Sequence, residues 1–119
     1  MTTYRSKFAL VAIASVLLAT PALAQTISPQ DAPSHIGKTV TVRGVVDEVH
    51  TSDRGNVFLN MGGHYPNQAF TGFIRARDAA AFANVQSYQG KTISISGALK
   101  LYKDKPEIEL QSASQISPK

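Results

Sequence analysis

Apolar and polar residues alternate in five short segments between Lys38 and Gln111, and residues that favour turns separate these segments. Alternation with a period of two is typical of β-strands that bury one face. The sequence therefore predicts five strands, which span residues 39–49, 57–61, 69–75, 92–99 and 107–111. An alanine-rich stretch lies between the third and the fourth of these, and we expect Asp78 to be the N-cap of a short helix that continues through Ala83.

The first predicted strand is long and has a glycine, Gly44, in its middle. A glycine inside a strand often marks a bend or a bulge, and a long bent strand can pair on both sides to close a small barrel. The order of strands and helix predicts a mainly β fold, a five-stranded Greek-key barrel of the OB-fold type with one short helix between strands three and four. Such a barrel usually binds ligands over its second and third strands, between the loops that follow strands one and four.

The N-terminal residues have the features of a secretory signal peptide. Arg5 and Lys7 precede an apolar run over residues 8–20, and an Ala-Leu-Ala cleavage signature ends at Ala24. The run is shorter than the roughly 20 residues that a helix needs to cross a membrane. We therefore expect residues 1–24 to be a signal peptide, with a periplasmic or secreted location and no stable membrane insertion after cleavage.

The rest of the chain is expected to form a polar, flexible arm over residues 25–35 and one small domain over residues 36–116. The sequence has 12 Lys and Arg residues against 8 Asp and Glu residues, and two of the basic ones lie in the predicted signal peptide. The remaining positive charge is too small to indicate nucleic-acid binding by itself. The absence of cysteine excludes a thiol enzyme, a Cys-ligated zinc domain and an iron–sulfur protein. We expect a monomer.

Two stretches also resemble a known family. GKTVTVRGVVDEVHTSDRGNVFLNMGGHYPNQAFTGFI and GKTISISGALKLYKDKPEIELQSASQI are similar to exported, single-domain bacterial OB-fold proteins. Those proteins share a GK-x-V-x-V-x-G opening, an FLN-x-G-x-x-YP centre and a Y-x-x-KPEI-x-L ending. The resemblance extends over residues 36–116 and implies a protein that is nucleic-acid-binding-like by its fold. The chain lacks the acidic strand pattern of the stress-linked periplasmic OB-fold proteins, so a cation-response role is not implied.

Candidate binding residues gather where an OB-fold places its groove. The first loop offers a histidine and an arginine, and the last hairpin offers a tyrosine and lysines. Cationic side chains meet phosphates and aromatic rings stack on bases, so single-stranded nucleic acid or a similar anionic polymer is the predicted ligand. The residues that we expect to bind it are Arg43, Arg54, Phe58, Asn60, Tyr65, Tyr102, Lys103 and Lys105.

These residues also have a purely structural interpretation. Hairpin tips are often charged because they are solvated, both Phe58 and Phe73 would fit a core, and Tyr65 would fit over the end of the barrel. Glu107 and Glu109 lie close to the hairpin in sequence and would repel phosphate. Because an exported protein seldom meets nucleic acid, the alternative function is an envelope interaction protein that recognises a polypeptide or a glycan.

The sequence does not indicate catalysis. The three histidines have no spacing that is typical of a metal site, and no G-x-S-x-G motif is present. Asp47 and Glu48 are neighbours on a predicted strand, where successive side chains point to opposite faces, so they are not expected to act as a carboxylate pair. We therefore expect a non-catalytic binding module with no metal and no cofactor.

Overall fold

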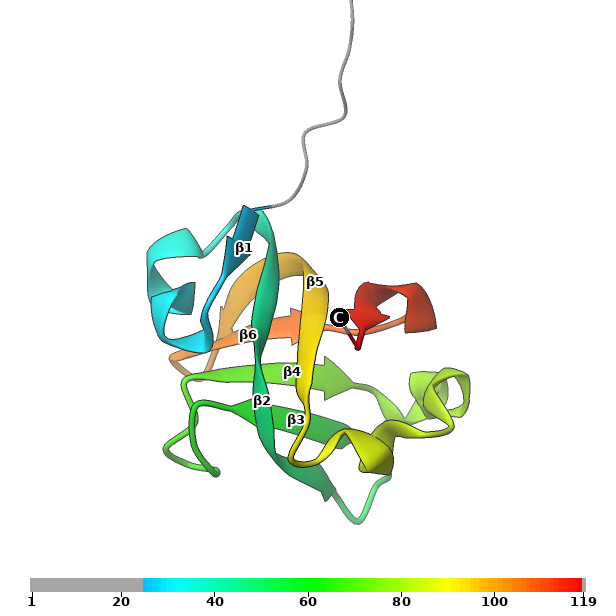
Figure 1. Ribbon diagram of the computed structural model, residues 1–119. Coiled ribbons are helices and arrows are strands. Elements are labelled where there is room, and N and C mark those ends of the chain that lie inside the picture. The colour runs from blue at the N-terminus through cyan, green and yellow to red at the C-terminus, as the bar shows by residue number, and fades with distance from the viewer. Residues whose placement is uncertain (1–24, 119) are drawn as a thin grey trace, which may run out of the picture.

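The computed structural model describes residues 25–118, and the predicted signal peptide, residues 1–24, lies outside the described residues. Strands dominate the described part of the chain, and its helices are short 3₁₀ segments, so the predicted mainly β class is confirmed (Figure 1). The strands are β1 (Gln25–Ile27), β2 (Thr39–Thr51), β3 (Val57–Met61), β4 (Phe70–Ile74), β5 (Thr92–Tyr102), β6 (Lys105–Glu109) and β7 (Ile116–Ser117). The helices are η1 (Pro29–His35), η2 (Ala76–Phe82), η3 (Val85–Tyr88) and η4 (Ala113–Gln115).

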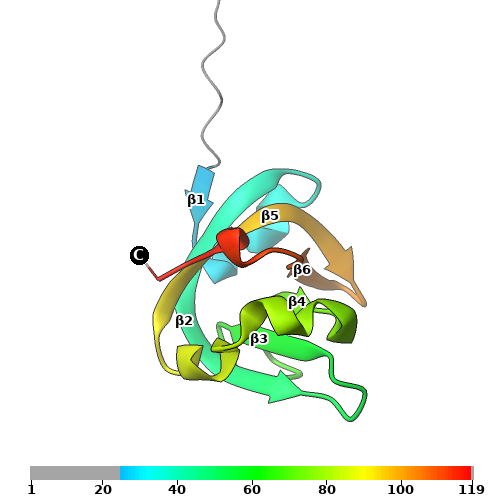
Figure 2. The same cartoon turned by 90° about the vertical axis from the view of Figure 1, so that its right-hand side faces the viewer.

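Five of the strands form a closed ring. They pair in the order β2, β3, β4, β6 and β5, and β5 pairs again with β2. Neighbours in the ring are antiparallel except for β4 and β6, which are parallel. β1 pairs in parallel with β2, and β7 pairs antiparallel with β5. In Figure 1, β2 and β5 run across the direction of β3, β4 and β6, and Figure 2 shows the same ring from the side.

The long strand β2 has a partner on each side, as its sequence predicts. Its first half, from Thr39 to Val45, pairs with β5, and its second half pairs with β3. The register with β3 shifts between Val46 and Glu48, which marks a β-bulge. The irregularity in β2 therefore lies beyond Gly44, which stays in the ladder with β5. The prediction of a two-sided strand is confirmed, whereas the position of its irregularity is corrected.

Gly44 instead allows η1 to lie close to the ring, because glycine has no Cβ atom. A Cβ atom at this position would lie 2.6 Å from Cγ and 3.0 Å from Cδ of Pro29. The proline ring cannot rotate away, so we expect Gly44→Ala to displace η1 and to cost about 1–3 kcal/mol of stability. Thermal unfolding followed by circular dichroism measures this cost.

The matched control is Pro29→Ala, which removes the proline ring atoms that a Cβ at position 44 would approach. Because the effects of substitutions at residues in contact are not additive, Gly44→Ala should cost much less stability in a Pro29→Ala background than in the natural chain. An alanine at position 44 that leaves the unfolding temperature of the natural chain unchanged would contradict the proposed contact.

The segment predicted as a flexible arm, residues 25–35, is instead built into the fold as β1 and η1. Ala32 is fully buried and Ile27 is 7% exposed, and η1 contacts β2, β4 and β6. The prolines and polar residues of the segment indicate disorder by composition. Proline also suits the first turn of a helix, because its fixed φ matches and its missing N–H is not needed there.

The predicted helix between the third and fourth ring strands is two 3₁₀ helices, η2 and η3. Asp78 lies inside the first turn of η2 and is not its N-cap, and neither N-cap residue makes a side-chain cap. Stretches this short seldom form a stable α-helix. Phe82 and Val85 join the core.

The core fills the ring with side chains from every ring strand and from η1, η2 and β1. Inward positions alternate along the strands as predicted. The largest fully buried side chains are Phe70, Leu59, Met61, Ile74, Ile93, Ile95, Leu99, Ile108, Leu110, Val40, Val42 and Val46. No helix within residues 25–118 has the length and hydrophobicity that would let it span a membrane.

Candidate functional site

A groove of about 720 Å³ lies on the outer side of β3, β4 and β6, and it extends to the β5–β6 hairpin and the end of β2. Its lining mixes aromatic, basic and amide side chains with one carboxylate. The lining residues are His50, Ser52, Asn56, Phe58, Asn60, Tyr65, Pro66, Gln68, Thr71, Phe73, Arg75, Lys100, Tyr102, Lys103, Lys105 and Glu107.

Most of the sequence-predicted site residues meet in this groove, but two do not. Arg43 and Arg54 are outside its lining. Arg43 lies on the half of β2 that pairs with β5, and its guanidinium donates a hydrogen bond to Ser94 at 3.1 Å. Arg54 lies in the turn between β2 and β3. The groove unites Phe58, Asn60, Tyr65, Tyr102, Lys103 and Lys105.

Three rings form a row across the strands at one end of the groove. Strand register places His50 beside Phe58 and Phe58 beside Phe73. The ring centroids of His50 and Phe58 are 5.9 Å apart with planes at 29°, and those of Phe58 and Phe73 are 5.2 Å apart at 40°. Both phenylalanines are half-buried and line the groove. Their interpretation as core residues is therefore wrong.

A second row, of polar side chains, runs parallel to the rings. Asn60 pairs in register with Thr71, and Thr71 pairs with Glu107. The Asn60 amide donates to Glu48 at 3.0 Å and accepts from the Thr71 hydroxyl at 2.8 Å. The Gln68 amide donates to the same hydroxyl at 3.1 Å. Asn60 is buried through this chain, which fixes the amide and hydroxyl groups in the groove wall.

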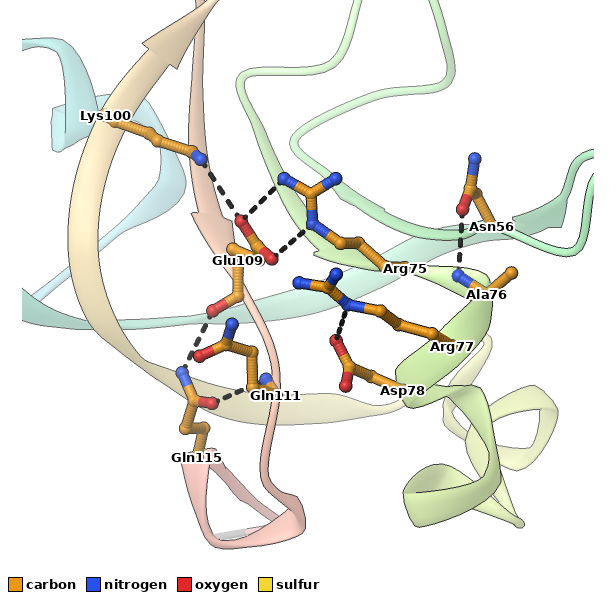
Figure 3. A network of polar contacts seen from close by, with 9 residues as sticks. All are labelled: Asn56, Arg75, Ala76, Arg77, Asp78, Lys100, Glu109, Gln111 and Gln115. Carbon is orange, nitrogen blue, oxygen red and sulfur yellow. Dashed lines mark hydrogen bonds and ion pairs between the residues drawn. The ribbon is translucent and has the colours of Figure 1, made fainter.

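The basic side chains fall into two groups. Arg75 and Lys100 both contact Glu109, at 2.7 Å and 3.4 Å, so part of their charge is already matched (Figure 3). The hydrogen bond from Arg75, followed by that from Lys100, lowers the pKa of Glu109. The Arg75 guanidinium also lies 5.9 Å from the centroid of the Phe73 ring, so a base stacked on that ring would meet a cation beside it.

The β5–β6 hairpin carries the second group. The Lys103 ammonium lies 5.4 Å from the centroid of the Tyr102 ring, and Lys105 donates to the backbone oxygen of Gln68 at 3.2 Å. Tyr102 is 54% exposed. The hairpin thus presents an accessible ring and two lysines at the rim, which suits contact with a polyanion.

Two carboxylates of β2 hold the opposite rim, which is the loop between β3 and β4. Asp47 accepts from the Gly63 N–H at 2.7 Å, and Glu48 accepts from the Tyr65 N–H at 3.0 Å. The bulge in β2 turns both side chains toward this one loop, which corrects the expectation that they point to opposite faces. Tyr65 is 74% exposed, so its interpretation as a packed cover of the barrel is also wrong.

The Glu48 contacts predict a pH-dependent loop. The Tyr65 N–H, followed by the Asn60 amide, lowers the pKa of Glu48. A lowered pKa means that this stabilisation is complete above the ordinary pKa of glutamate and is lost as the pH falls through the lowered value. We expect Glu48→Gln at neutral pH to speed hydrogen exchange of the Tyr65 amide by about tenfold, since a hydrogen bond to a charged group is worth about 1.5–3 kcal/mol.

The control for this loop prediction is Asp53→Asn, which removes a carboxylate from the turn between β2 and β3. Exchange of the Tyr65 amide should not change in that variant. Equal exchange rates in Glu48→Gln and in the natural protein would contradict the anchoring role.

Sequence reasoning passed over Thr71 and Arg75. Both lie on the third predicted strand, in which Phe70, Gly72 and Ile74 are buried. The same alternation that turns Phe73 toward the groove also turns these two residues toward it, so the signal was present. Within residues 25–118, no cluster of His, Asp or Glu could hold a metal ion.

No protein-family model matches the chain, and neither does any curated protein. Solved structures do share its fold. The asparaginyl-tRNA synthetase of Entamoeba histolytica matches 76% of this chain with a TM-score of 0.53 and 18% identity. The aspartyl-tRNA synthetase of the same organism matches 85% of it with a TM-score of 0.52 and 19% identity. The matched regions are 23% and 27% of those two proteins, so the likeness concerns the fold of one part of each enzyme.

Proposed function

We propose that this protein is an exported, non-catalytic OB-fold module that binds single-stranded nucleic acid or a similar anionic polymer. The row formed by His50, Phe58 and Phe73 carries the proposal, because it places three aromatic rings in the lining of a groove that basic side chains also line. Bases stack on such rings and phosphates contact such cations without a need for a particular sequence.

Other features support the same proposal. The ring order and the groove over the second and third ring strands match the usual ligand face of an OB-fold. The two similar solved structures are enzymes named for tRNA, which is a nucleic acid. The positive n-region, apolar run and cleavage signature in residues 1–24 support export.

Fluorescence anisotropy with a labelled oligonucleotide of about 12 thymidines tests the proposal. With two or three phosphate contacts, the affinity should fall roughly 30- to 100-fold for a tenfold rise in salt. Replacing Lys103 and Lys105 together by alanine should flatten this dependence. The control replaces Lys38 and Lys91 by alanine. This change removes the same amount of positive charge at positions outside the groove lining. The absence of binding at low salt would end the proposal.

A second candidate function is recognition of a polypeptide or glycan in the cell envelope. Tyr65, Leu101 and Tyr102 are 74%, 53% and 54% exposed, and exposed large apolar side chains are frequent at recognition surfaces. Thermal shift with soluble envelope glycans and with oligonucleotides separates the two candidates. Stabilisation by a glycan and by no oligonucleotide would favour this second function.

A further inference from the structure

The groove lining also contains a largely buried acidic residue, Glu107, which has no role in stacking on His50, Phe58 and Phe73. Glu107 lines the groove and is 6% exposed. No side chain or backbone group within residues 25–118 donates a hydrogen bond to its carboxylate, and no cation of that part of the chain lies within ion-pair distance of it. Burial raises the pKa of Glu107 more strongly than the nearby charge of Lys100 lowers it.

A second unpaired acceptor lies beside it. Gln68 is 5% exposed, and its amide nitrogen donates to Thr71, which is the register neighbour of Glu107. The side-chain oxygen of Gln68 is buried and has no hydrogen-bond partner among the described residues. A buried acceptor without a partner, such as this Gln68 oxygen, is rare and costly. The Gln68 oxygen and the Glu107 carboxylate, which lines the groove, would both be stabilised by a ligand that donates hydrogen bonds.

The spacing of the two rows places these acceptors at the edge of a stacked base. Phe73 and Thr71 are two residues apart on β4, which corresponds to about 7 Å along a strand. Glu107 lies opposite Thr71 on the neighbouring strand. A base stacked on Phe73 would thus extend its edge toward the carboxylate.

Glu109 cannot take this role, although it is two residues from Glu107 on β6. Its carboxylate already accepts from Arg75 and Lys100 (Figure 3). Phosphate groups would be repelled by both carboxylates, so the backbone of a bound strand would lie toward the lysines of the hairpin. This arrangement turns the bases toward the floor of the groove.

Resting on the proposed function, we infer that the groove prefers a base whose edge donates two adjacent hydrogen bonds to Glu107, and that this base is guanine. The N1–H and N2–H groups of guanine match the two oxygens of one carboxylate. Thymine offers one N–H between two carbonyl oxygens, and those oxygens would face the negative charge. Single-stranded recognition commonly reads this edge of the base.

Anisotropy with labelled oligonucleotides of about 12 residues tests the inference. The two central bases of an otherwise thymidine strand are guanine, hypoxanthine or thymine. The guanine strand should bind about tenfold more tightly than the thymine strand, as a paired two-donor contact allows. Hypoxanthine lacks the N2 amino group and should fall between them.

The protein side of the test compares two glutamates of the same strand. Glu107→Gln should reduce the preference for guanine to within about twofold, because the amide offers only one acceptor. Glu109→Gln should bind all three strands more tightly, because it frees Arg75 and Lys100, and should keep the preference. The hypoxanthine comparison needs no variant, so the inference stays testable if a variant fails to fold.

Each other outcome has a definite meaning. Equal binding of the three strands to the natural protein overturns the guanine inference and leaves the proposed function standing. A guanine preference that persists in folded Glu107→Gln overturns the role of this carboxylate. The absence of binding by all three strands at low salt ends both the inference and the proposed function.

Discussion

Replacing Phe73 by leucine is expected to weaken the binding of a single-stranded oligonucleotide by roughly tenfold, since one stacked base contributes about 1–3 kcal/mol. Phe73 has both an aromatic and a cationic neighbour, because its centroid lies 5.2 Å from that of Phe58 and 5.9 Å from the Arg75 guanidinium. Leucine keeps most of the apolar volume and loses the flat face. Anisotropy at low salt measures the change.

The control for this prediction is Phe82→Leu, which makes the same change in the core, in η2 and outside the groove lining. It should alter the unfolding temperature and leave the affinity unchanged. Phe73→Leu should show the reverse pattern. Wild-type affinity in a folded Phe73→Leu protein would remove the main argument for a stacking surface.

Replacing Phe70 by alanine should have the largest effect on stability, a loss of about 3–5 kcal/mol. Phe70 lies on the same strand as Phe73, but its side chain is fully buried in the ring. The chain has no cysteine, so no disulfide can compensate for a weakened core. In a domain of this size, such a loss lowers the unfolding temperature by roughly 15 °C or more.

Thermal and urea unfolding followed by circular dichroism measure this loss. Phe73→Ala is the matched control on β4, and it should cost much less because its ring is already half-exposed. A Phe70→Ala protein that melts within a few degrees of the natural one would show that the ring core is not the source of stability.

Strand positions were predictable because alternation is a local signal, and both ends of the strand predicted at residues 57–61 are correct. The ends that face the last hairpin were not predictable. The sequence predicts that the fourth strand ends at Leu99 and that the fifth begins at Glu107. The structure extends them to Tyr102 and Lys105, with only Lys103 and Asp104 in the turn. Both turn residues have positive φ, 49° and 67°. Tight hairpins of this kind usually have Asn-Gly or Asp-Gly in the turn, and this turn contains neither dipeptide.

The residues of the candidate site were predictable only on strands that do not change their pairing partner along their length. Phe58 and Phe73 follow from the outward face of β3 and β4. Arg43 was misplaced because β2 changes partner near its middle, so the outer faces of its two halves belong to different surfaces. The bulge that turns Asp47 and Glu48 toward one loop depends on tertiary pairing and leaves no mark in the local sequence.

The pairing of β2 with β5 closes the ring, and these two strands are synthesised at well-separated times because they are far apart in the sequence. Thr39 lies opposite Ala98, so more than half of the domain must be synthesised after β2 before its partner exists. Contacts of such long sequence separation slow folding. The ring therefore cannot close until β5 has been synthesised, and in the proposed exported protein this delay would leave time for transport of the chain before the ring closes.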